Sequence, residues 1–167
     1  MNYTTPDPQA WIDPKAAVVP MISKRSGMIR PPNILPIFIE GQPIAYQLYE
    51  KWGVDTPWGR IECPLGMICD GASVPRALWV AYPPDGLYRA AALAHDRGFS
   101  LGGKFEDFTL TFRQVNEMMK WVMDRSHVSE KDAWIIYKAV SSFAGRLAFR
   151  SSSKRGPRVE PLYYEIS

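Results

Sequence analysis

The sequence predicts an α+β fold, in which a small antiparallel β-sheet in the N-terminal part packs on about three α-helices in the C-terminal part. Residues 17–69 contain short runs of Ile, Val, Tyr and Phe separated by Gly or Pro, which is the pattern of strands joined by turns. After residue 70 the spacing of apolar residues changes to three and four, which is typical of helices. No helix-length segment separates the strands, so we expect them to pair antiparallel.

Within residues 17–69, three apolar runs predict strands and two further segments predict a connection and a return. The strands are expected at 17–22, 34–40 and 44–49, a turn-rich connection at 52–59, and a last strand, broken by a proline, at 60–68. Gly, Pro and Asp gather in the connection, and these residues favour turns.

The first two helices have recognisable starts. A stop signal at 83–86 precedes an Ala- and Leu-rich helix at 87–99, whose residues have high helix propensity. Thr111 and Gln114 have the spacing of a capping box, in which two side chains bond the free amides of a helix start. We therefore expect the second helix to begin at Thr111.

A third helix is predicted to open at Ser129 and Asp132. One face carries Ile136, Val140, Phe143 and Leu147, so we expect a single helix that reaches Leu147 and is either nearly buried or in contact with a partner. The residues that follow, 150–160, are basic and rich in Ser, and they predict an exposed linker.

The composition is that of one folded domain, with 167 residues, 46% hydrophobic and 22% charged. A net charge of +3 is too mild to indicate nucleic-acid binding, and no apolar run approaches the roughly 18 residues of a membrane span. The N-terminus lacks the pattern of a signal peptide. Cys63 and Cys69 have no second pair beside them, so we expect reduced thiols in a protein made in the cytoplasm.

Within that chain we distinguish three parts: an extended arm at 1–16, a single α+β domain at 17–149 and a basic tail at 150–167. Prolines at positions 6, 8 and 14 favour extended backbone in the arm. Two interpretations of the arm stay open, a segment ordered by a partner and a frayed terminus.

Two polar groups are candidates for chemistry. His95 and Asp96 are adjacent in the Ala-rich helix, where burial without a partner costs several kcal/mol. Asp70 and Ser73 lie where the sheet gives way to the helices, and functional side chains often gather in such connections. Each group also has a structural interpretation, a capped core histidine in the first case and a strand-to-helix corner in the second.

These residues carry a resemblance to a domain family of unknown function from tailed phages and prophages. The matching segments are Asp70-Gly-Ala-Ser73-Val-Pro75-Arg76, Tyr88 to Asp96 and a helix opening near Arg113, and the resemblance covers roughly residues 43–147. It implies a virion or assembly protein, associated with the tail, that is made in the host cytoplasm. Its implied partners are other phage proteins or a second copy of the chain.

The same pattern looks like the helical core of phospholipase A2 enzymes. That resemblance implies that His95 is a general base, that Asp96 binds calcium, and that an Asp on the next helix orients the imidazole. Here the orienting position falls on Asn116, and Phe99 stands where the pattern has Tyr. The short connection at 100–110 favours adjacent packing of the two helices, so we expect His95 and Asn116 within hydrogen-bonding reach on neighbouring antiparallel helices. Asn holds a ring by a hydrogen bond but does not stabilise imidazolium, so the resemblance favours a structural or relict site.

Three function hypotheses follow. The first is the tail-associated phage protein with a structural polar site. The second is a calcium-assisted hydrolase of phospholipid or another envelope component. Its catalytic residues would be His95, Asn116, Asp70 and Ser73, and its metal ligands Asp96 and Asp70. The third, nucleic-acid contact through the basic tail, is disfavoured because a solvated charged segment is the commoner explanation of such a run.

Overall fold

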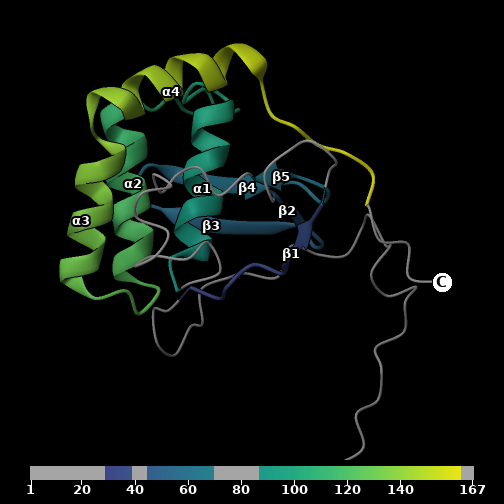
Figure 1. The fold of residues 1–167 in the computed structure, drawn as a ribbon, viewed down its shortest axis with the longest axis horizontal. Helices are drawn as coiled ribbons and strands as arrows, with labels where there is room; N and C mark the ends of the chain where they lie inside the picture. The colour runs from purple at the N-terminus through teal and green to yellow at the C-terminus, as the bar shows by residue number, and fades with distance from the viewer. Residues whose placement is uncertain (1–28, 39–44, 70–86, 163–167) are drawn as a thin grey trace, which may run out of the picture.

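The computed structural model describes residues 29–38, 45–69 and 87–162, and it confirms the α+β class. Short strands occupy the N-terminal half and helices the C-terminal half. Figure 1 shows α1, α2 and α3 standing side by side, with α4 lying across their ends. The predicted arm at 1–16, the predicted strand at 17–22 and the corner that holds Asp70 and Ser73 lie outside the described residues.

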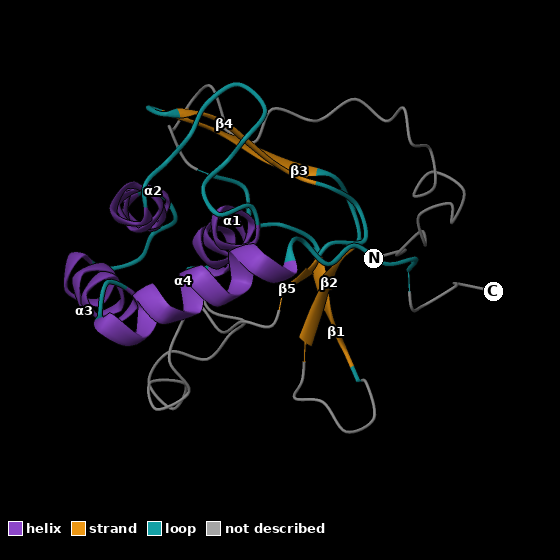
Figure 2. Cartoon of the chain, turned by 90° about the horizontal axis from the view of Figure 1, so that it is seen from above, coloured by secondary structure: helices purple, strands orange, loops and turns teal. Residues whose placement is uncertain are grey.

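The described strands form two sheets instead of the single sheet that we predicted. They are β1 (Ile34–Ile37), β2 (Ala45–Leu48), β3 (Trp52–Thr56), β4 (Gly59–Cys63) and β5 (Ile68–Cys69). β1, β2 and β5 pair antiparallel in the order β1-β2-β5, and β3 pairs with β4 in a separate hairpin. Figure 2, a view from above, shows the hairpin apart from the other three strands.

The prediction of a turn-rich connection at 52–59 is wrong for most of its length, because β3 occupies Trp52–Thr56. Trp52 and Val54 pair with Cys63 and Ile61 of β4, and all four side chains are buried. This period-two alternation is a strand signal, but Gly53 and Asp55 stand between the apolar residues and masked it. Only the tight turn at 57–58 remains of the predicted connection.

The helices are α1 (Arg89–Ser100), α2 (Phe112–Asp124), α3 (Glu130–Val140) and α4 (Phe143–Arg155). The predicted capping box is confirmed: the Thr111 side chain accepts from the Gln114 amide, and the Gln114 side chain accepts from the Thr111 amide. Ser129 caps α3 in the same way through the amide of Asp132. These local bonds satisfy amides that have no partner inside the helix.

The prediction of one third helix reaching Leu147 is wrong, because the chain turns at Ser141–Ser142 and α4 begins. The Ser142 side chain accepts a hydrogen bond from the Gly145 amide and so caps the new helix. A Cβ at Gly145 would lie 1.9 Å from the Val140 carbonyl oxygen, so only glycine fits this corner. Leu147, predicted to share the buried face, is 49% exposed. The predicted linker is also wrong at 150–155, where α4 continues to Arg155.

After α4 the chain returns to the sheet. The amide of Ile68 donates to the carbonyl of Arg158, and the amide of Glu160 donates to that of Gly66. The side chain of Gln47, fully buried in β2, donates to the carbonyls of Glu160 and Pro161. The segment 158–161 therefore covers the edge that β5 would otherwise leave open.

Candidate functional site

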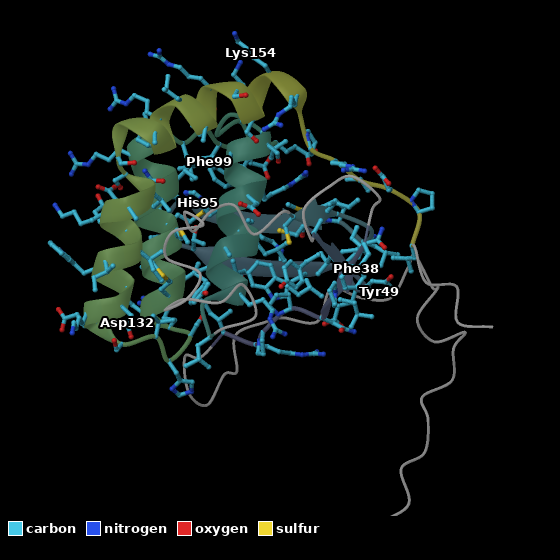
Figure 3. All side chains as sticks on the ribbon, viewed as in Figure 1. Phe38, Tyr49, His95, Phe99, Asp132 and Lys154 are labelled. Atoms are coloured by element: carbon cyan, nitrogen blue, oxygen red, sulfur yellow. The ribbon has the colours of Figure 1, made fainter. Side chains whose placement is uncertain are left out.

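His95 lies at the centre of the helical layer because α1 is enclosed on several sides. One side of α1 packs on the β3–β4 hairpin, a second on α2 and a third on α4. Ala90, Ala91, Leu93 and Ala94 are almost fully buried. Only 1% of His95 is exposed, and Figure 3 shows its side chain within the layer, below the labelled Phe99.

The ring of His95 bonds to Asn116 of α2, as the sequence predicted for neighbouring antiparallel helices. The distance from His95 Nε2 to Asn116 Oδ1 is 2.8 Å. An amide oxygen only accepts, so with this orientation of the amide Nε2 carries the proton and donates it. Asn116 is itself 1% exposed. Among the described residues, its Nδ2 has no hydrogen-bond partner.

Burial keeps the His95 ring neutral. Loss of solvation lowers the pKa of His95 from 6.5 to about 4, although the hydrogen bond to Asn116 partly opposes the shift. A buried charge is costly, and an amide oxygen compensates it only in part. The ring is therefore uncharged at neutral pH, as expected of a core histidine.

Aromatic rings pack beside the imidazole. The centroid of Phe99 lies 4.0 Å from that of His95, one turn along α1. Phe99 also contacts Phe112 of α2 and Phe149 of α4, at centroid distances of 6.1 and 5.0 Å. Phe99, which stands where the resemblance expects Tyr, thus joins three helices and adds no hydroxyl to the site.

Asp96 faces a cavity that His95 also lines. The cavity has a volume of about 690 Å³, within the range of small-molecule sites. Small residues of α4 form much of its wall, among them Ala144, Gly145 and Ala148. The sequence did not predict this wall, because its apolar spacing indicated one helix through Leu147. The wall forms only because α4 is separate from α3. The Ala144–Ala148–Ser152 spacing of four was the signal that could have shown it.

The described residues do not fit a calcium ion. Calcium takes six to eight oxygen ligands, and Asp96 is the one carboxylate that the described residues contribute to the cavity wall. In the same part of the chain, no group of three or more His, Cys, Asp or Glu side chains is placed to hold a metal. Asp70, the second predicted ligand, lies outside that part, as does Ser73.

The cysteines are free thiols, as predicted, and both are buried. Burial raises the pKa of the Cys63 thiol above its usual range. Its sulfur lies 3.9 Å from the carbonyl oxygen of Leu93. Because the thiolate is the reactive form, Cys63 is a packing residue of the core.

Fold and site together define a small α+β domain whose buried His–Asn pair joins two helices beside a cavity. Residues 46–140 match the family described as protein of unknown function (DUF1353), and the chain belongs to that family. No curated protein and no solved structure gives a significant match to the chain. In the described segments, no helix is long and apolar enough to span a bilayer.

Proposed function

We propose that this protein is a structural or assembly protein of a tailed bacteriophage, associated with the tail, and that His95 and Asn116 serve its architecture. The phage assignment is supported by the motif resemblance at Asp70–Arg76 and Tyr88–Asp96. It implies a protein made in the host cytoplasm that becomes part of the virion. The architectural role rests on one observation: a neutral ring, 1% exposed, bonded to a buried amide.

The buried His95–Asn116 pair is better suited to holding α1 and α2 together than to proton transfer. A general base works best when its pKa lies near the working pH, and burial lowers the pKa of His95 to about 4. A carboxylate beside the ring would raise that pKa, but the partner of Nε2 is the Asn116 amide. A satisfied hydrogen bond between two buried groups instead fixes how α1 and α2 pack.

Exposed aromatic side chains support a role in contacts with other proteins. Phe38 and Trp134 are 72% and 54% exposed, and aromatic residues are enriched in protein interfaces. Their partner in this proposal is another phage protein or a second copy of the chain.

The test is mass spectrometry of purified particles of the phage or prophage that encodes the chain. We expect the protein at a constant number of copies per particle after gradient purification and after a high-salt wash. Absence from washed particles would contradict the proposal.

The second candidate function is a hydrolase of phospholipid or another envelope component, and the cavity favours it. His95 and Asp96 both line a space of about 690 Å³, which is large enough for a substrate group and a water molecule. In that function His95 takes a proton from the water that attacks the ester carbonyl. Calcium is the metal that the resemblance implies for it.

An assay of fatty-acid release from mixed phospholipid vesicles, with and without calcium, distinguishes the two functions. We expect no turnover by the wild type. Asn116→Asp places a carboxylate beside the His95 ring, so any latent calcium-dependent activity should rise in that variant. Adding His95→Ala should then remove that activity. Robust wild-type turnover that His95→Ala abolishes, with the fold intact by circular dichroism, would establish the hydrolase instead.

A further inference from the structure

The last helix concentrates positive charge. α4 contains Arg146, Arg150, Lys154 and Arg155 and no Asp or Glu among its 13 residues. The whole chain carries a net charge of only +3, so this one helix is much more basic than the rest. The sequence suggested a solvated linker here, but a helix fixes the cations relative to one another.

Three of these cations form a row on the outside of the molecule. Ala144, Ala148 and Ser152 line the cavity, and the row Arg146, Arg150 and Lys154 is displaced from them by two positions. Two positions correspond to about 200° around a helix, so the cations face away from the cavity. All three are exposed, and Figure 3 shows Lys154 pointing outward from the top of the molecule.

On the neighbouring helix α2, by contrast, cations form ion pairs with carboxylates. On α2, Arg113 pairs with Glu117 at 2.7 Å and Lys120 with Asp124 at 2.8 Å. Within the described part of the chain, no carboxylate lies within 4.0 Å of the three cations in the α4 row. The positive charges of the row are therefore not neutralised by ion pairs within the described residues, and they are open to an external anion.

Helix stability does not explain the row. Lys154 lies in the last turn, where a cation interacts favourably with the helix dipole, but Arg146 lies near the start, where it does not. Like charges four residues apart weaken a helix, and the row contains two such pairs. The guanidinium of Arg146 lies 5.4 Å from the Phe112 ring, whereas Arg150 has no comparable aromatic contact among the described residues.

We propose that the outward face of α4 binds the phosphate backbone of duplex DNA through Arg146, Arg150 and Lys154. Four residues of helix span about 6 Å, so the row presents three positive groups at regular intervals along about 12 Å. Ser151, three positions before Lys154, is also exposed, and serine hydroxyls also donate to phosphates. The interaction is with the backbone and is independent of base sequence.

The composition of the face favours duplex DNA over a membrane or a single strand. Helices that bind bilayers insert large apolar side chains, but Phe149 packs inward against Phe99 and Phe112. Of the described α4 side chains, Leu147 is the one large apolar group that is exposed. Single-strand binders use aromatic platforms for base stacking, and no described side chain on this face supplies one.

The experiment measures fluorescence anisotropy of a labelled 30-base-pair duplex with the full-length chain between 50 and 200 mM salt. Three phosphate contacts predict a slope of log affinity against log salt of about −3. The variant R146Q/R150Q/K154Q should bind at least tenfold more weakly at 100 mM salt, with a slope between 0 and about −1. Glutamine keeps a good helix propensity, so its circular dichroism should match the wild type.

The matched control is R60Q/R113Q/K120Q, which removes three cations that have carboxylate partners. Both triple variants lower the net charge from +3 to 0. A loss of DNA binding in the α4 variant alone therefore shows that the DNA contacts α4. A second variant, Arg150→Glu, creates favourable pairs four residues apart within α4; it should keep or raise the melting temperature and still weaken DNA binding. If DNA binding tracked the melting temperature in these variants, the proposal would fail.

Three further results would overturn the proposal. The first is no binding of the duplex at 50 mM salt. The second is equal binding by the wild type and the α4 variant. The third is tighter binding of phosphatidylglycerol vesicles or of a single strand than of the duplex, which would assign the face to a membrane surface or to unpaired nucleic acid.

Discussion

The two sides of α1 are packed in opposite ways. Toward α2 the contact is close: a Cβ at Gly98 would lie 2.7 Å from Val115, and His95 bonds Asn116 at 2.8 Å. Toward α4 the same helix borders a cavity of about 690 Å³ whose wall includes small residues. One side of a helix can therefore seal a polar pair while the other keeps space beside it. Chemistry at His95 would need the open side, whereas its cohesive bond lies on the closed side.

The largest expected effect tests the closed side through pH. The folded-state pKa of His95 is about 4, against 6.5 for the free group, so the unfolded chain takes up the proton first. The free energy of unfolding therefore keeps its full value above about pH 6.5 and decreases as the pH falls toward 4. At 1.36 kcal/mol per pKa unit, the loss is about 3 kcal/mol. Urea unfolding at pH 7 and pH 4 measures it.

Two variants isolate this contribution. His95→Gln, which does not titrate, should show a pH dependence of the unfolding free energy about 3 kcal/mol smaller than the wild type. His127→Asn removes the other histidine, which is exposed and has a positive φ of 59° that Asn tolerates. It should keep the wild-type dependence; identical curves for all three proteins would show that His95 is accessible to solvent.

The next effect tests how close the α1–α2 contact is. Gly98→Ala improves helix propensity by about 1 kcal/mol, but the new methyl group overlaps the stiff side chain of Val115. Overpacking typically costs about 1–3 kcal/mol, so we expect a net loss of about 1 kcal/mol in urea unfolding. In the Val115→Ala background the same change should instead stabilise the protein. A gain in both backgrounds would show that the two helices have room to separate.

The smallest effect tests the open side. Ala148→Leu extends a side chain toward the cavity, where filling space commonly adds about 0.5–2 kcal/mol. Because the site borders solvent, we expect a gain at the lower end, below about 1 kcal/mol, from the urea midpoint. A loss larger than that would mean that the α4 side is as closely packed as the α2 side.

Local signals predicted the parts of the fold that depend on neighbouring residues. Thr111 and Ser129 cap their helices by bonds three residues away, so the sequence was enough to locate both starts. The short connection after α1 likewise predicted that His95 would meet Asn116. What these residues do in the cell is a separate question, and their chemical role stays a prediction.

Features set by distant contacts were missed. The alternation in β3 includes Gly53 and Asp55, which favour turns, and the pairing of Trp52 and Val54 with β4 is what makes this segment a strand. The break between α3 and α4 depends on the approach of Gly145 to the Val140 carbonyl, which the apolar period through Leu147 conceals. The cavity depends on the same break, because residues of α4 form part of its wall. It could therefore not be predicted from the apolar spacing either. The division into arm, domain and tail stays a prediction.

The return of residues 158–161 to the first sheet has a consequence for biosynthesis. Gln47 and Glu160 are 113 residues apart in sequence but share a hydrogen bond. A nascent chain therefore exposes the β5 edge on the ribosome until residue 161 has emerged, and the order of synthesis delays completion of the sheet. An early stop after Arg155 would release a chain that contains α1 to α4 but whose β5 edge is left open for pairing with other chains.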